Sequence, residues 1–205
     1  MIDTESRDGV DDVVTLWLDP VCPFSWNTAR WLTDAADKVG FGVDLQLMNL
    51  AVLNEGRQLP PPQQARMNDS RVVGRLMAAV REEVPASALA AAYFTFGQLY
   101  FDQSAPVDGR LVQEVASAAG AQRIAGTVLD DAAWDSAVRF AHEASQSALG
   151  DVGGSPLITI GGHTVFGPVL SAVPDPDRTL PVFEAVAALV ATPQFAQLQR
   201  PRTHP

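Results

Sequence analysis

The chain has 205 residues, enough for one or two domains with a substantial core, and 47% of them are hydrophobic, as in ordinary globular proteins. Its 24 acidic residues outnumber 14 basic ones, and this net charge of −10 argues against nucleic acid and against anionic membrane surfaces as partners. The single cysteine, Cys22, excludes an intrachain disulfide, a zinc site built on several thiolates and an iron–sulfur cluster.

The first predicted strand is 13–18 (VVTLWL), which is rich in β-branched and aromatic residues and is ended by Asp19-Pro20. Residues 1–12 precede it as an acidic tail without the apolar run of a signal peptide. The chain also lacks the roughly 18 consecutive apolar residues that a membrane span needs. We therefore expect a cytoplasmic protein, in a compartment where a lone thiol stays reduced.

A helix is predicted directly after Cys22. Pro23 suits the first helical position because its missing N–H would have no partner there, and Gly40 closes a helix that runs to about Val39. Cys22 then lies at or beside the N-cap. Residues 43–49 alternate in hydropathy and make a second strand. A strand, a helix and a strand in this order predict a parallel pair with a right-handed crossover.

The next part of the chain shows only helical signals. A proline run at 59–62 predicts a rigid extended linker, and helical spacing of apolar residues follows over 63–149. Within this stretch, Asp108 is a candidate N-cap and Gly120 a candidate C-terminal glycine of one helix.

Strand patterns return after the segment 153–156 (GGSP). Residues 157–160 and 163–166 flank two glycines, which is typical of a two-residue hairpin turn. A last helix is expected over 180–191, with Thr179 as its cap.

This element order predicts an α/β, thioredoxin-like fold, with a mixed sheet of four strands, helices on both faces and an inserted all-helical domain. The thioredoxin-like domain is discontinuous and comprises 13–58 and 150–195, while the helical insertion comprises 62–149. Residues 1–12 and 196–205 are expected to be tails.

Cys22 is the strongest candidate for chemistry. At a strand-to-helix junction the positive end of the helix dipole and several N–H groups face the sulfur, and both lower the pKa of a thiol and make it a nucleophile. A buried structural cysteine is the alternative. Ser25 lies one turn further on, where its hydroxyl could donate to the thiolate, or where it could simply be exposed.

Ser155-Pro156 is the second candidate. In thioredoxin-like folds a cis-proline just before the third strand packs against the active-site sulfur, and the residue before it offers its backbone to an extended thiol substrate. Gly153 and Gly154 would let a ligand approach the backbone closely. An ordinary loop proline is the alternative.

Aromatic residues allow two interpretations. Trp26 could shape a pocket for a flat substrate, although packing in the core is the commoner role of such a side chain. A cluster in the insertion could line a hydrophobic cleft over Cys22 or form helical core: Tyr93, Phe94, Phe96, Tyr100 and Phe101.

The three histidines do not have the spacing of a metal site. We expect His142 to be solvated on its helix, His163 to lie on the surface of a hairpin strand, and His204 to lie in the tail. No nucleotide-binding motif is present.

Five segments spread over the chain carry a resemblance to a known family. The chain resembles the DsbA-like branch of the thioredoxin superfamily and, within it, the actinobacterial mycothiol-dependent nitroreductases. The segments are WLDPVCPFSWNTARWL (17–32), LMNLAVLNEG (47–56), DVGGSPLITIGG (151–162), VFGPVLSAVP (165–174) and QRPRTHP (199–205).

The resemblance implies an oxidoreductase that takes electrons from mycothiol, the low-molecular-weight thiol that replaces glutathione in those bacteria. Its expected substrates are nitro compounds, other electrophiles or mixed disulfides, and it implies mycothiol as co-substrate without a metal or flavin. The resemblance assigns the role of nucleophile to Cys22 and that of the cis-proline to Pro156, and it implies that Ser155 lends its backbone to the bound thiol. With the residues beside them, we expect catalysis at Cys22, Pro23 and Ser25 and thiol binding at Ser155, Pro156, Gly154, Phe24 and Trp26.

One departure from the wider superfamily decides the expected mechanism. Dithiol members carry Cys-x-x-Cys, whereas this motif reads CPFS and ends in Ser25. Because Ser25 cannot resolve a mixed disulfide and no other cysteine exists, a thiol–disulfide cycle must use Cys22 alone, with a second small thiol or a partner protein as the resolving group.

Two other functions fit the same architecture. Kappa-class glutathione transferases and 2-hydroxychromene-2-carboxylate isomerases use a serine at this motif to activate a bound thiol, and Ser25 would then matter more than Cys22. The chain could also be a non-catalytic thioredoxin-like binding protein. A homodimer is compatible with the sequence, although no periodic apolar face indicates one.

Overall fold

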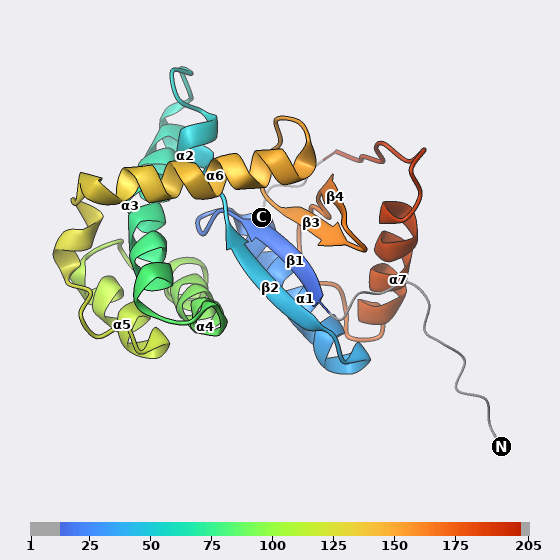
Figure 1. Ribbon diagram of the computed structural model, residues 1–205, viewed down its shortest axis with the longest axis horizontal. Coiled ribbons are helices and arrows are strands. Elements are labelled where there is room, and N and C mark those ends of the chain that lie inside the picture. Colours follow the sequence, from blue (N-terminus) through green and yellow to red (C-terminus); the bar gives the residue numbers. More distant parts are fainter. Residues whose placement is uncertain (1–12, 202–205) are drawn as a thin grey trace.

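The computed structural model describes residues 13–201, and in this part of the chain a four-stranded mixed sheet lies beside a helical lobe (Figure 1). The strand order is β2-β1-β3-β4. β1 and β2 are parallel, and the other neighbours are antiparallel, which confirms the predicted mixed sheet. The strands are β1 (Val13–Leu18), β2 (Gly42–Leu47), β3 (Leu157–Ile160) and β4 (His163–Phe166).

Most of the predicted tails lie beyond this range. The acidic segment 1–12 and the last four residues, 202–205, which include His204, are outside the described residues. The division into domains stays a prediction.

Two helices pack together beside the sheet, α1 (Pro23–Val39) and α7 (Thr179–Val190). The ring of Phe183 on α7 stacks on Phe41 with ring centroids 4.8 Å apart, and its centroid lies 6.2 Å from that of Trp31 on α1. All three side chains are buried in the main hydrophobic core. This aromatic contact fixes the two helices against each other, and thereby fixes the position of the α1 N-terminus.

The first turn of α1 forms as the sequence predicts. Cys22 is the N-cap, in an extended conformation, and Pro23 occupies the first helical turn. The helix ends at Gly40, whose φ of 91° lies in the left-handed region that glycine adopts without steric cost.

The chain between the two halves of the sheet is helical throughout its regular structure. Its long elements are α3 (Pro61–Glu83), α4 (Ala86–Gly97), α5 (Gly109–Ala119) and α6 (Asp135–Leu149). Shorter ones are α2 (Leu50–Leu53), a π-helix η1 (Gln98–Asp102) and the 3₁₀ turns η2 (Gly126–Leu129) and η3 (Ala132–Trp134).

Two caps and one turn are confirmed. A carboxylate oxygen of Asp108 accepts hydrogen bonds from the N–H groups of Arg110 and Leu111, and Gly120 ends α5 with a φ of 74°. The hairpin turn 161–162 has two glycines at φ 58° and 74°, the conformation that a two-residue hairpin requires.

Two local predictions are wrong. The proline run is not a fully extended linker, because Pro61 begins α3, where a missing N–H costs no hydrogen bond, and Pro60 is its N-cap. Thr179 is not a cap but the first residue of α7. Its hydroxyl donates to Asp34 at 2.6 Å, and its carbonyl accepts from the indole N–H of Trp31 at 3.2 Å.

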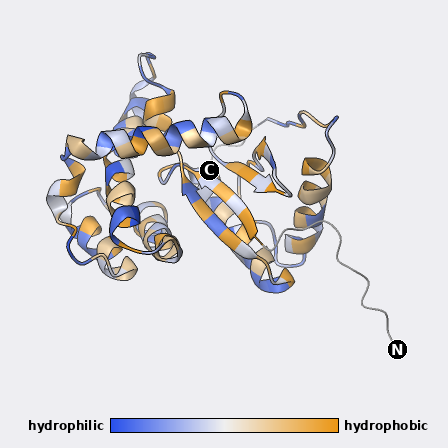
Figure 2. Cartoon of the chain, viewed as in Figure 1, coloured by the Kyte–Doolittle hydropathy of each residue, from blue (hydrophilic) through white to orange (hydrophobic). Residues whose placement is uncertain are grey.

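α6 runs across the sheet and contacts β2 and β4 (Figure 1). Hydropathy alternates along β1 and β2, as expected for strands whose two faces meet different surroundings (Figure 2). A hollow of about 500 Å³ lies between these strands, α3 and α6; Trp17, Gln46, Arg81 and Phe140 are among the residues that line it.

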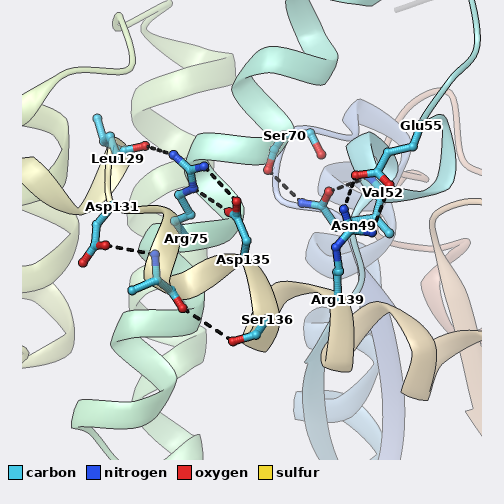
Figure 3. Close-up of polar contacts among 11 residues, drawn as sticks. Asn49, Val52, Glu55, Ser70, Arg75, Leu129, Asp131, Asp135, Ser136 and Arg139 are labelled. Carbon is cyan, nitrogen blue, oxygen red and sulfur yellow. Dashed lines mark hydrogen bonds and ion pairs between the residues drawn. The ribbon is translucent and has the colours of Figure 1, made fainter.

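Ion pairs connect α6 to α3 and to the segment that follows α2 (Figure 3). Arg75 on α3 donates to both carboxylate oxygens of Asp135, at 2.7 and 3.1 Å, and to the carbonyl of Leu129 at 2.8 Å. Arg139 on α6 forms a two-pronged pair with Glu55. The bidentate geometry specifies orientation as well as contact, so α6 is held in one position relative to α2 and α3.

The prediction for His142 is wrong, because the side chain is buried and only 7% exposed. It lies on α6, and its Nδ1 accepts a hydrogen bond from the backbone N–H of Asn49 at 3.5 Å. Asn49 in turn caps α2 and donates to the carbonyl of Ser70 (Figure 3). Burial lowers the pKa of His142 below its ordinary 6.5, because a charged imidazole is poorly solvated there.

This burial predicts a pH dependence of stability. The unfolded chain protonates His142 near its ordinary pKa, whereas the folded chain does so only at lower pH. The free energy of unfolding therefore keeps its full value above that ordinary pKa and decreases as the pH falls below it. The contribution of His142 to this decrease is at most ~1.4 kcal/mol per pH unit.

Denaturant unfolding measured between pH 7.5 and 5.5 checks this prediction. The His142→Asn variant should lose the part of the slope that His142 contributes. His163→Asn is the matched control, because His163 is exposed on β4, and it should keep the wild-type slope. Equal slopes in wild type and His142→Asn would contradict the assignment.

Candidate active site

Cys22 lies between the end of β1 and the first turn of α1, and is 4% exposed. Its Sγ donates to the carbonyl oxygen of Ser155 at 3.4 Å, across the contact between the two halves of the sheet domain. Its own carbonyl accepts from the N–H of Trp26 at 3.0 Å. The resting sulfur is therefore a thiol with a defined acceptor, directly beside the segment that precedes β3.

A short chain of hydrogen bonds runs behind the sulfur. The backbone N–H of Asp19 donates to the hydroxyl of Ser155 at 2.8 Å, and this hydroxyl lies 2.6 Å from that of Ser25. If the Ser155 hydroxyl donates its hydrogen bond to the Ser25 hydroxyl, the Ser25 hydroxyl can in turn donate to Cys22. In this arrangement the Asp19 N–H and both serine hydroxyls each donate one hydrogen bond. Ser25 is fully buried, which rules out the exposed alternative.

Burial dominates the acidity of Cys22 and raises the pKa of its thiol above the ordinary value. Hydrogen bonds from the hydroxyl and N–H of Ser25 and from the N–H of Phe24 act in the opposite direction, while the nearby charge of Asp19 raises the pKa further. The prediction of a lowered pKa is therefore wrong for the resting protein, although the helix N–H groups do face the sulfur as expected.

The Ser155–Pro156 peptide bond is cis, as the sequence led us to expect. A second cis bond, at Gly167–Pro168 after β4, was not predicted. The segment that follows it docks on α1: the carbonyl of Pro168 accepts from the hydroxyl of Thr28 at 2.8 Å. The sequence offered only Gly-Pro as a signal here, which indicates the end of a strand as readily as a docking loop.

Packing within the protein accounts for Gly153 but not for Gly154. A Cβ at Gly153 would lie 2.3 Å from a methyl group of Leu149, and one at Gly154 would lie 3.4 Å from the ring of Phe166. The predicted close approach of a ligand is thus not needed to account for Gly153.

Asp19 is the main residue that sequence reasoning missed. The carboxyl group is completely buried. One oxygen accepts from the N–H of Val21 at 2.8 Å, and the other accepts from the N–H of Leu50 at 2.6 Å and the hydroxyl of Ser70 at 2.5 Å. Burial raises its pKa, and these hydrogen bonds oppose the rise. Asp19 thus joins the active-site turn to α2 and α3.

Trp26 is buried in the contact between α1 and the insertion, with 5% of its surface exposed. Gly97 lies so close that a Cβ there would be 2.3 Å from the indole ring. The structure therefore favours the core interpretation of Trp26. The rings around it, at centroid distances of 6.0, 5.8 and 5.9 Å, are those of Tyr93, Phe94 and Phe101.

The structure thus brings Cys22, Pro23, Ser25, Ser155 and Pro156 together. His163 lies apart, on the exposed β4 strand. Within residues 13–201 no group of three or more histidine, cysteine or acidic side chains is placed to hold a metal ion. In the same range no helix is long and apolar enough to cross a membrane.

Solved structures share this architecture. The chain is similar to a 2-hydroxychromene-2-carboxylate isomerase, with 19% identity, a TM-score of 0.57 and coverage of 86% of this chain and 95% of that one. The chain is also similar to a probable DsbA oxidoreductase from Streptomyces coelicolor, with 19% identity and a TM-score of 0.54. This match covers 88% of this chain and 92% of that one. The cytosolic disulfide reductase DsbM from Pseudomonas aeruginosa, solved with GSH, is similar with 15% identity and a TM-score of 0.52. The match covers 86% of this chain and 99% of that one. At these identities the likeness shows the DsbA-like fold.

Sequence comparison identifies the family. The chain is 26% identical over 192 residues to the uncharacterized protein Rv2286c of Mycobacterium tuberculosis, which covers 93% of this chain and 82% of that protein. The model of the Rv2466c-like family, described as mycothiol-dependent nitroreductase Rv2466c, matches residues 21–200. This match includes Cys22 and the segment around Pro156, and the chain therefore belongs to the Rv2466c-like family of mycothiol-dependent nitroreductases, which are enzymes.

Proposed function

We propose that this enzyme runs a monothiol cycle on Cys22 with mycothiol as the electron donor. One observation carries the proposal: the only sulfur nucleophile of the sequence lies at the N-terminus of α1 and contacts the residue that precedes a cis-proline. Sequence and geometry both support Cys22 as the reacting residue.

The cycle needs no second cysteine. In the first step the Cys22 thiolate attacks the mycothiol sulfur of a mixed disulfide between mycothiol and a substrate thiol, so that a Cys22–mycothiol disulfide forms and the substrate thiolate leaves. In the second step a mycothiol thiolate attacks the mycothiol sulfur of the Cys22–mycothiol disulfide, which regenerates Cys22 and releases mycothiol disulfide. For a nitro substrate, two mycothiol molecules supply two electrons and two protons, enough to convert the nitro group to a nitroso group and water, and the two mycothiol molecules leave as mycothiol disulfide.

The residues beside the sulfur suit an extended thiol. The backbone of Ser155 lies within reach of Cys22, Pro156 and Gly154 flank it, and the N–H of Phe24 faces the sulfur. We assign contact with mycothiol to these four residues, and to Trp26 an indirect role in shaping the site from within the core. We place the reaction in the cytoplasm, where a lone thiol stays reduced.

Intact-mass spectrometry tests the proposal. After exposure to mycothiol disulfide, the protein should gain the mass of a single mycothiol, mapped by proteolysis to the peptide that contains Cys22, and a second portion of mycothiol should remove it. If no adduct forms with folded protein, the monothiol cycle is wrong and a non-catalytic binding role is favoured.

A further inference from the structure

Tyr93 is anomalous among the buried polar groups. Its side chain on α4 is completely buried, and its hydroxyl is the one buried side-chain nitrogen or oxygen within residues 13–201 that lacks a hydrogen-bond partner. Leaving a hydroxyl unpaired in a protein interior is unfavourable, so native structures rarely do so without a functional reason.

The position of Tyr93 connects it to the active site. Its ring contacts the ring of Trp26 edge-on at 6.0 Å, and the backbone N–H of Trp26 donates to the carbonyl of Cys22, one turn earlier at the N-cap of α1. Gly97, one turn further along α4, lets the indole lie directly on the helix. Burial raises the pKa of the Tyr93 hydroxyl, and negative charge on Cys22 or Asp19 raises it further. The hydroxyl therefore stays protonated and remains a donor.

The other polar groups around the sulfur are already engaged. Both carboxylate oxygens of Asp19 accept hydrogen bonds, so this carboxylate is satisfied without the thiol. The hydroxyls of Ser25 and Ser155 bind each other. Once Cys22 loses its proton, its contact with the Ser155 carbonyl changes from a hydrogen bond to a repulsion. Ser25 and Phe24 already donate to the sulfur, and a further donor would stabilise the thiolate in place of the lost contact.

We propose that the Tyr93 hydroxyl is a donor held in reserve for the Cys22 thiolate, to which it binds when the sulfur ionises or leaves a mixed disulfide. This role rests on the proposed function of Cys22. It explains why the hydroxyl has no partner in the resting thiol state: the partner exists only during the reaction. Tyr93 then lowers the energy of the state in which sulfur carries the charge, both when it attacks and when it leaves.

Nuclear magnetic resonance on protein labelled with carbon-13 at the cysteine Cβ tests the proposal. Because the chain has one cysteine, the titration gives one signal and needs neither mycothiol nor access to the sulfur. The groups whose charge or hydrogen bonds act on Cys22, namely Asp19, Phe24 and Ser25, are unchanged in the variant. In Tyr93→Phe the titration midpoint of Cys22 should rise by about one pH unit, while the thermal midpoint stays equal or rises because an unpaired hydroxyl is removed.

Tyr100→Phe is the matched control. The Tyr100 hydroxyl donates to Asp69 at 2.7 Å, so its loss should lower the thermal midpoint and leave the Cys22 titration unchanged. An unchanged or lowered Cys22 midpoint in Tyr93→Phe would overturn the proposal. A raised midpoint in protein that forms no mycothiol adduct would support the role of Tyr93 and contradict the proposed function instead.

Discussion

Replacing Cys22 by serine should abolish both the mycothiol adduct and mycothiol-dependent reduction, with a loss of activity of at least about 10³-fold. A serine hydroxyl is a far weaker nucleophile than a thiolate, and the sequence contains no other cysteine to replace it. Intact mass and steady-state rates on a nitro compound or a mixed disulfide measure the two effects. Thermal unfolding checks that the variant, which differs by one atom in a buried position, is still folded.

Ser25→Ala is the matched variant, and it separates two enzyme classes. In the monothiol cycle Ser25 only donates to the sulfur, so its loss should reduce the rate by about 10-fold and leave the adduct intact. In an enzyme of the kappa-class transferase or isomerase type, Ser25→Ala should reduce activity more than Cys22→Ser does, since the serine activates the bound thiol. Retained activity in Cys22→Ser together with abolished activity in Ser25→Ala would overturn the monothiol assignment.

The geometry favours the cysteine. Ser25 is fully buried and its hydroxyl is bound to Ser155, which places it behind the sulfur. The fold shared with a 2-hydroxychromene-2-carboxylate isomerase does not decide the question, because one architecture supports several chemistries.

Local patterns were sufficient where the physics is local. An extended stretch, Asp-Pro and then Cys-Pro determine a strand end and a helix start within ten residues, and the position of Cys22 follows from them. The pKa of Cys22 does not follow, because the helix N-terminus acts locally whereas burial depends on parts of the chain far away in sequence, such as the segment before β3. Burial outweighs the helix in the resting state.

The same distinction explains which site residues were missed. Asp19 bonds to Leu50 and Ser70, which are 31 and 51 residues away in sequence, and to the hydroxyl of Ser155 through its N–H at a separation of 136. An aspartate before a proline is typical of the end of a strand, and no neighbouring residue in the sequence indicates that Asp19 has such distant partners. Tyr93 was identified only as one of five aromatic residues, because its lack of a partner is a property of the packed structure.

Asp19→Ala should lower the free energy of unfolding by about 3 kcal/mol or more. The substitution removes the acceptor of two backbone N–H groups and of the Ser70 hydroxyl, and all of these donors are buried or partly buried at the junction of β1, α2 and α3. No water-filled surface lies beside the carboxyl group, which is 0% exposed, so the donors lose their partner without compensation. Urea unfolding followed by circular dichroism measures the change.

Two further variants make the result specific. Asp19→Asn keeps one oxygen but presents an NH₂ group to donors on the other side, and should fall between wild type and Asp19→Ala. Asp37→Ala removes an exposed carboxylate from α1 and should change the free energy of unfolding by no more than about 0.5 kcal/mol. If Asp19→Ala were as stable as Asp37→Ala, the carboxylate would not be the joint between the active-site turn and the insertion. If it is strongly destabilised, the insertion is held in place by the same residue whose backbone N–H orders Ser155 beside Cys22, and the fold and the site depend on one group.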